Sequence, residues 1–180
     1  MRLLAGVLLG VALLHAQAGA PARPSADSLL NGAQAQAASS QRAVFVIFHA
    51  SWCGWCRRLD AFLEDPAIKP VIDKYFVKVY FTVQEHEGKQ DLNTAGGDEL
   101  LAKLGGIKQG LPFFAFLDSQ GKMLVNTIRL DAYGKPLGSI GHPYKPYEVD
   151  WFLVMLNKAA PAMTAGEKAA IEHYLRTQEK

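Results

Sequence analysis

The sequence contains little cysteine. Cys53 and Cys56 are the only two in 180 residues. A structural zinc site takes four ligands, which two thiols cannot supply alone, and a framework of several disulfides is excluded. The one possible bridge closes a very short loop, and such a bridge stabilises a fold less than one closing a long loop. We therefore interpret the pair as a redox dithiol rather than a structural cross-link.

The sequence also lacks an excess of one charge. Its net charge is +2, and it carries no polybasic run, nucleotide-binding motif, haem motif or internal repeat. The charge balance therefore predicts neither nucleic acid nor an anionic membrane surface as a partner. With 49% hydrophobic residues, the chain can bury a core, and its length fits one domain.

One long apolar run is present, at the N-terminus. Leu3–Leu14 follows Arg2 and precedes the small-residue site Ala16-Gln17-Ala18. This pattern is typical of a secretory signal peptide. The run is shorter than the ~20 residues that span a bilayer, although an uncleaved anchor is the alternative. We expect a signal peptide over residues 1–18 and a periplasmic or secreted product without stable membrane insertion.

The next segment, residues 19–42, is rich in Ala, Gln, Ser and Pro. We expect a partly ordered lead-in, with helical tendency over Asp27–Ala38 that Asn31-Gly32 interrupts. A single domain is expected over residues 43–180.

Hydrophobic periodicity predicts an α/β domain. The expected strands are 43–50, 76–83, 113–117 and 122–130. One helix is expected to start at Cys53, and four more are expected over 71–75, 98–104, 147–159 and 164–178. Loops are expected over 84–97 and 131–146. The turn Asp118–Gly121 is too short for a crossover, so it predicts an antiparallel hairpin, whereas the first two strands are joined by a helix and predict a parallel pair.

The two cysteines occupy different positions on the predicted helix. Cys53 falls at its N-cap, where the Cys56 amide can donate to the sulfur and the helix dipole favours a thiolate. Such positions lower the pKa of a cysteine from about 8.5 towards 7. Cys56 lies one turn further on, on the apolar side with Leu59. We therefore expect Cys53 to be the exposed, attacking thiol and Cys56 the buried, resolving thiol.

The motif Trp52-Cys53-Gly54-Trp55-Cys56 follows a buried strand, and Gly110-Leu111-Pro112 precedes another. With these features the sequence resembles the thioredoxin superfamily, in particular exported thioredoxin-like proteins with a Trp-Cys-Gly-Trp-Cys motif. The resemblance implies a three-layer fold, with a central mixed sheet of about four strands flanked by helices and an extra C-terminal helix. It also implies a thiol–disulfide oxidoreductase with a redox-active Cys53–Cys56 disulfide, acting on protein or small-molecule disulfides. We expect no cofactor, an unidentified redox partner and a monomer.

The same resemblance implies further site residues. Pro112 would be cis and lie beside the dithiol, and the Leu111 backbone would pair with an extended substrate. Trp52 and Trp55 would contact substrate or cover the dithiol. The alternatives are an ordinary trans proline, and packing of Trp55 on a neighbouring loop.

Two positions depart from thioredoxin. Ile47 stands where thioredoxin carries a buried acid that moves protons to and from the buried cysteine. His49 replaces the usual aromatic residue at the end of the strand, and it is a possible modulator of the thiolate or else a packing residue. Proton transfer at the dithiol is therefore missing or comes from other groups.

Two other groups of residues are candidate sites. Glu85-His86-Glu87 could suggest a metal, but the segment is expected to be a solvated loop, and no metal is predicted there or at the two cysteines with His49. The aromatic loop residues Tyr133, His142, Tyr144 and Tyr147 either frame a binding surface or pack on their own domain.

Two other functions fit the same residues. The protein could be a thioredoxin-like binding or chaperone module whose cysteines form a static bridge. It could also be a copper- or zinc-handling protein. The direction of electron flow depends on the potential of the pair relative to its partners.

Overall fold

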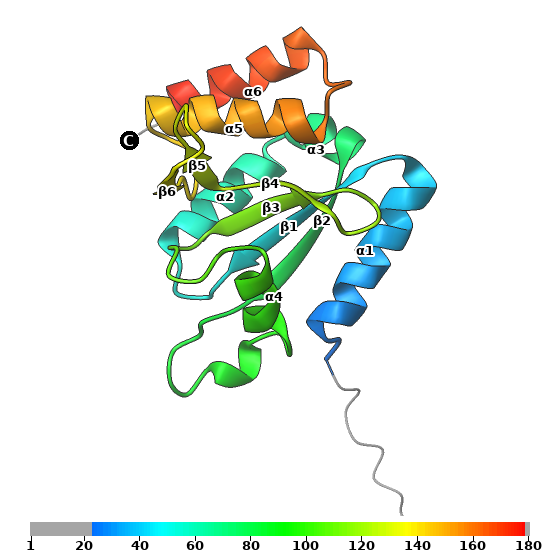
Figure 1. The fold of residues 1–180 in the computed structure, drawn as a ribbon, viewed down its shortest axis with the longest axis vertical. Coiled ribbons are helices and arrows are strands. Elements are labelled where there is room, and N and C mark those ends of the chain that lie inside the picture. Colours follow the sequence, from blue (N-terminus) through cyan, green and yellow to red (C-terminus); the bar gives the residue numbers. More distant parts are fainter. Residues whose placement is uncertain (1–22, 179–180) are drawn as a thin grey trace, which may run out of the picture.

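The computed structural model of the chain describes residues 23–178 (Figure 1). The predicted signal peptide over residues 1–18 lies outside the described residues. Among the helices of residues 23–178, none is long and apolar enough to cross a bilayer.

The helices and strands follow the predicted order, except that a 3-10 turn and the strand Pro136–Ser139 are added and the predicted strand 122–130 is divided into two. The helices are α1 Ala26–Ser40, α2 Gly54–Glu64, α3 Lys69–Tyr75, α4 Gly97–Lys103, α5 Pro146–Ala159 and α6 Ala165–Thr177, with a 3-10 turn η1 at Gln90–Leu92. The strands are β1 Ala43–His49, β2 Phe76–Thr82, β3 Phe113–Leu117, β4 Met123–Asn126, β5 Ile128–Leu130 and β6 Pro136–Ser139.

Four strands form a mixed sheet in the order β2-β1-β3-β4. β1 pairs parallel with β2 and antiparallel with β3, and β3 pairs antiparallel with β4. β1 is therefore an inner strand, with a layer of helices on each face of the sheet (Figure 1). The predicted three-layer thioredoxin-like fold with C-terminal helices is confirmed.

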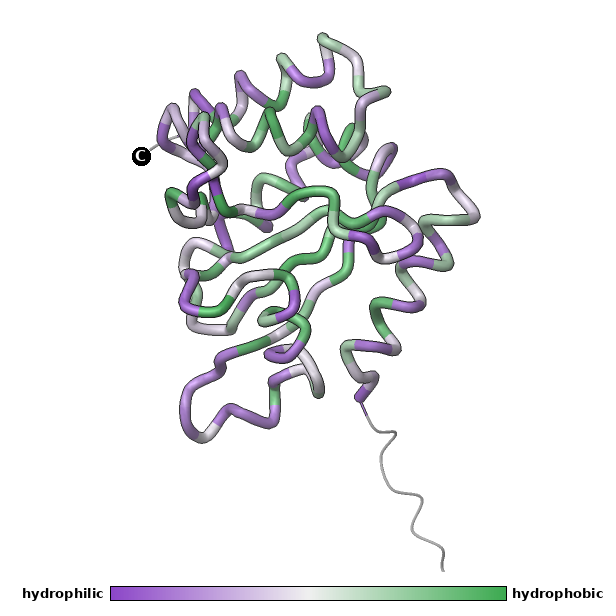
Figure 2. Tube along the Cα trace, viewed as in Figure 1, coloured by the Kyte–Doolittle hydropathy of each residue, from purple (hydrophilic) through white to green (hydrophobic). Residues whose placement is uncertain are grey.

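Alternate residues of the inner strands face two separate cores. On one face Phe45, Phe114 and Phe116 pack with buried residues of α2, α3, α5 and α6. On the other, Val46 and Ala115 pack with α1 and α4. Because both faces are covered, β1 and β3 are hydrophobic along almost their whole length, as the green central strands of Figure 2 show.

The lead-in segment differs from its prediction. From Ala26 the chain forms one continuous helix, α1, whose N-cap Ser25 accepts a hydrogen bond from the Ser28 amide. Ala33 and Ala37 on this helix are buried in the second core. The expected interruption at Asn31-Gly32 is wrong. Packing against the sheet outweighs the ~1 kcal/mol cost of a helical glycine, so the ordered domain begins before Ala43.

The predicted strand 122–130 is also different, because it is divided between two sheets. The Asn126 side-chain oxygen accepts a hydrogen bond from the Ile128 amide, a local bond that competes with continued strand pairing. Beyond this point β5 pairs with β6 in a separate two-stranded sheet. The segment 131–146, expected to be a loop, therefore contains a strand.

The packing of α1 gives the first prediction. Ala37 is buried and Ala35 is exposed on the same helix. Leucine has nearly the helix propensity of alanine, so Ala37→Leu tests packing. We expect Ala37→Leu to lower the free energy of unfolding by about 1–3 kcal/mol through overpacking. Ala35→Leu should change it by less than about 0.5 kcal/mol. Equal effects in urea denaturation would show that α1 is not packed on the sheet.

Candidate active site

The two cysteines form a disulfide at the N-terminus of α2, with an S–S distance of 2.03 Å. Cys53 is the N-cap residue, and its sulfur accepts a hydrogen bond of 3.1 Å from the Cys56 amide. This confirms the predicted N-cap position and its donor. No acidic residue lies in the first turn of α2, so no carboxylate offsets the positive end of the helix there.

The predicted difference in exposure between the cysteines is wrong for this disulfide form. Cys53 and Cys56 are each only 3% exposed. Ala50 is buried with the pair, and Leu111 packs against this cluster. The packing of Ala50 and Leu111 on the pair covers both cysteines in the disulfide form.

Leu111 and Pro112 lie where the resemblance places them. The Leu111–Pro112 peptide bond is cis, as expected. Leu111 contacts the buried cysteine cluster, and Pro112 leads directly into β3. The cis-proline segment and the disulfide, more than 50 residues apart in sequence, are therefore side by side.

The two tryptophans beside the cysteines are partly exposed, Trp52 by 43% and Trp55 by 42%. Trp52 donates from Nε1 to the Gln84 carbonyl and stacks on His86 at 5.0 Å between ring centroids. Trp55 stacks on Tyr144 at 4.8 Å. Each indole thus rests on a neighbouring loop and still presents surface to solvent.

Glu85 is more buried than its sequence context predicts. It is only 7% exposed, whereas a solvated loop was expected. Its carboxylate accepts hydrogen bonds from the amide and the hydroxyl of Ser51, two residues before Cys53. The bond from the Ser51 amide, then that from its hydroxyl, lowers the pKa of Glu85. Its sequence signal is its place a few residues after β2, a strand parallel to β1.

Polar groups also gather beside the apolar Ile47. His49 lies two residues further along β1, on the same face, and its Nε2 is 3.2 Å from the Thr82 hydroxyl. Burial lowers the pKa of His49, a shift that the charges of Asp60 and Glu85 oppose. Burial raises the pKa of Asp60 on α2. An ionisable pair, His49 and Asp60, therefore lies next to the position of the missing acid.

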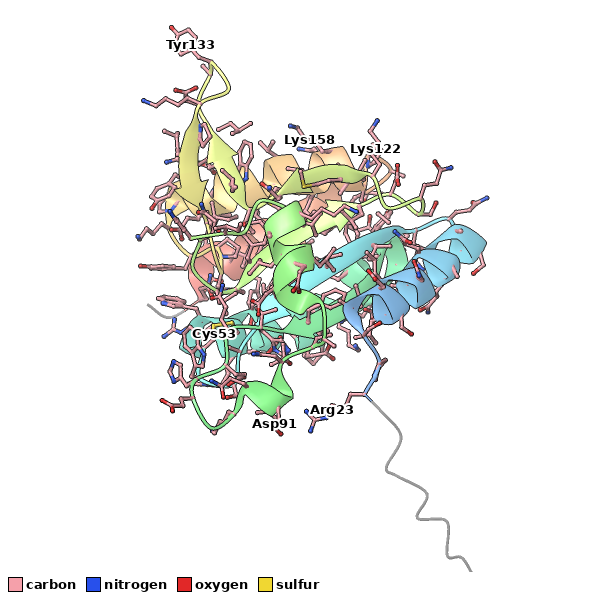
Figure 3. All side chains as sticks on the ribbon, turned by 60° about the horizontal axis from the view of Figure 1, so that its bottom comes forward. Arg23, Cys53, Asp91, Lys122, Tyr133 and Lys158 are labelled. Carbon is pink, nitrogen blue, oxygen red and sulfur yellow. A yellow bond between two sulfur atoms is a disulfide. The ribbon has the colours of Figure 1, made fainter. Side chains whose placement is uncertain are left out.

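The four aromatic loop residues are not one surface. Tyr133 is 96% exposed and points away from the molecule at the tip of the β5–β6 hairpin (Figure 3). Tyr147 lies under the Arg129 guanidinium. His142 and Tyr144, in contrast, lie beside Trp55. Only these two belong to the surroundings of the disulfide.

Among residues 23–178, no group of three or more His, Cys, Asp or Glu side chains is placed to hold a metal ion. In the segment Glu85-His86-Glu87, Glu85 accepts a hydrogen bond from Ser51, and His86 stacks on Trp52. Both residues therefore contact the loop that precedes Cys53.

Comparison with known protein families assigns the chain to a family. A family model described as thioredoxin-like matches residues 26–119, which include the disulfide and Pro112. The chain belongs to the thioredoxin-like family. The match begins at α1, in agreement with the packing of that helix, and it ends before the β5–β6 hairpin and the last two helices.

Several solved structures are similar to this thioredoxin-like protein. The disulphide isomerase of Xylella fastidiosa Temecula1 has 20% sequence identity and a TM-score of 0.48, over 81% of this chain and 85% of that chain. The oxidised C-terminal domain of DsbD from Neisseria meningitidis has 20% identity and a TM-score of 0.43, over 74% and 99%. No curated protein matches. The family assignment therefore rests on residues 26–119.

Glu85 gives the second prediction. Its negative charge near the start of α2 opposes a thiolate on Cys53, and Glu85→Gln removes the charge while keeping an acceptor for the Ser51 amide. We expect reduced Glu85→Gln to be alkylated at Cys53 about two- to fivefold faster than wild type at pH 6. Glu87→Gln, two residues further along the loop and exposed, is the matched control. Slower or unchanged alkylation of Glu85→Gln would contradict this electrostatic role.

Proposed function

We propose that this protein is a thiol–disulfide oxidoreductase that acts on protein or small-molecule disulfides through Cys53 and Cys56. The observation that carries the proposal is the disulfide at the N-terminus of α2, with the Cys56 amide bonded to Cys53 Sγ and Leu111 packed against the pair. The sequence pattern of residues 1–18 supports an exported compartment, where disulfides form and persist.

The exchange needs only the two sulfurs and a substrate. In the reducing direction, the Cys53 thiolate attacks one sulfur of a substrate disulfide and releases the first substrate thiol. The Cys56 thiolate then attacks Cys53 Sγ, closes the bridge and releases the second thiol, so two electrons pass to the substrate. The oxidising direction is the reverse. The Cys56 amide and the start of α2 stabilise the Cys53 thiolate in both directions.

Asp60 is proposed as the group that exchanges the proton of Cys56. It follows Cys56 by four residues on α2, so the two side chains are neighbours on one helix face. Burial raises the pKa of Asp60, and the charge of His49 opposes this shift. A carboxyl with a raised pKa can hold a proton nearer to neutral pH. Together with His49, Asp60 would do the work of the acid that Ile47 replaces.

A second candidate is a binding or chaperone module with a static disulfide. The 3% exposure of both cysteines favours it, because attack on the bridge requires access to Cys53 Sγ. The two candidates differ in catalysis, because a static bridge transfers no electrons to a substrate.

Insulin reduction by dithiothreitol separates the two candidates. We expect the wild-type protein to accelerate the reaction, and Cys53→Ser to lower the rate to that of dithiothreitol alone, because the attacking thiol is lost. Cys56→Ser should instead accumulate a mixed disulfide between Cys53 and substrate, visible by mass spectrometry. Equal rates for wild type and Cys53→Ser would refute the oxidoreductase and favour the static bridge.

The role of Asp60 makes a separate prediction. Asp60→Asn should slow release of the mixed disulfide about three- to tenfold at pH 6, and less at pH 8, where Cys56 ionises more readily without help. Asp65→Asn, at the end of the same helix, is the control. Stopped-flow fluorescence of single turnovers measures the step. A loss in Asp60→Asn that is equal at both pH values would indicate a structural role.

A further inference from the structure

A cavity of about 220 Å³ lies beside the disulfide. Trp55 and Leu111 line it on the dithiol side, and His142, Tyr144 and Glu148 line it from the segment after β6. The cavity is much larger than the space that one water needs, so it has room for a side chain. The lining residues His142, Tyr144 and Glu148 lie outside residues 26–119, the part of the chain that matches the family model.

The tautomer of His142 follows from its neighbour Gln178. The Gln178 side-chain nitrogen donates to the Pro143 and Leu175 carbonyls, which fixes the orientation of the amide. Its oxygen lies 2.7 Å from Nε2 of His142 and can only accept. His142 therefore carries its proton on Nε2, and Nδ1 is a hydrogen-bond acceptor.

That acceptor has no partner among the described residues, although His142 is only 3% exposed. Burial lowers the pKa of His142 below its ordinary value, and the charge of Arg58 acts in the same direction, whereas the hydrogen bond to Gln178 and the charge of Glu148 oppose the shift. The ring is thus neutral at pH 7. An unpaired buried acceptor is costly, by about 1–3 kcal/mol, so a donor from a bound molecule would be favourable.

The charges around the cavity select a neutral donor. The Arg58 guanidinium lies 5.1 Å from the Trp55 ring, and the Lys145 ammonium 5.4 Å from the Tyr144 ring. The Arg58 cation opposes a positively charged ligand group. The Glu148 carboxylate accepts from the Tyr144 and Lys145 amides and pairs with the Lys145 ammonium at 3.8 Å, so the charges of this pair offset each other and favour neither an anionic nor a cationic ligand group.

We propose that this cavity is a substrate subsite. It binds a neutral hydrogen-bond-donating side chain, such as the phenol of tyrosine, that lies near the reactive cysteine of an extended polypeptide. The side chain packs between Trp55 and Leu111 and donates to Nδ1 of His142, which is buried in the free protein and is reached when the partly exposed Trp55 indole moves aside. The inference rests on the proposed function, because the polypeptide is the one whose cysteine reacts with Cys53.

The test compares tyrosine with phenylalanine, which differ only by the hydroxyl. Symmetrical disulfides are made from short peptides with one cysteine, and Tyr, Phe, Lys or Glu is placed at each of the two positions on either side. Reduced protein is mixed with each disulfide. Cys53 displaces one peptide thiol, Cys56 displaces the second, and the two electrons come from the protein dithiol. The second-order rate constant is followed by tryptophan fluorescence.

At one position we expect the Tyr peptide to react about tenfold faster than the Phe peptide, because Phe leaves the acceptor of His142 unpaired. The Lys and Glu peptides should also be slower than Tyr. In His142→Phe the Tyr/Phe ratio should fall to about one. His173→Phe, the same change at an exposed histidine of α6, should keep the wild-type ratio.

Nitrogen-15 NMR of the histidine rings of Cys56→Ser tests the same contact without removing His142. The Tyr peptide, trapped on Cys53, should shift Nδ1 of His142 towards the value of a hydrogen-bonded acceptor, and the Phe peptide should not. Equal Tyr and Phe rates at every position, with no Nδ1 shift, would overturn the subsite and leave the oxidoreductase intact. No reaction with any peptide would overturn both proposals.

Discussion

Burial of β1 on both faces is the constraint on which the rest of the structure depends. Its alternate side chains supply the centres of two separate cores, so helices must cover both sides of the sheet. The strand ends at His49, and the chain reaches Cys53 at the start of α2 a few residues later. The same burial that stabilises the domain thus holds the disulfide at one end of the sheet, where the loops after β2 and before β3 also meet.

The surroundings of the disulfide combine apolar cover with a few oriented charges. Leu111 and Ala50 exclude water from the sulfurs, and the Cys56 amide supplies the hydrogen bond that stabilises charge on Cys53. Glu85 holds Ser51 and brings a carboxylate near the start of α2, and Asp60 and His49 are the groups proposed to exchange the proton of Cys56. The site is thioredoxin-like, but Ile47 cannot carry a proton, so we propose Asp60 and His49 for that role.

Local sequence patterns predicted the parts of this structure that depend on interactions between residues close in sequence. The apolar run of β1, the N-cap Cys53 and the C-terminal helices needed only periodicity and capping, and the cis Pro112 came from the family resemblance. Contacts distant in sequence were not predictable. The burial of Glu85 depends on Ser51, more than 30 residues away, and that of His142 on Gln178. Order in α1 likewise came from packing on the sheet, which its Ala- and Gln-rich composition did not reveal.

The central claim is that the Cys53–Cys56 bridge opens and closes in the folded protein. Equilibration of the wild-type protein in graded glutathione and dithiothreitol buffers, with acid trapping of thiols and mass spectrometry, measures it directly. The account predicts one reversible two-electron transition at which circular dichroism shows the domain still folded. A bridge that stays closed at every ratio until the domain unfolds would contradict the account and identify the disulfide as a structural one.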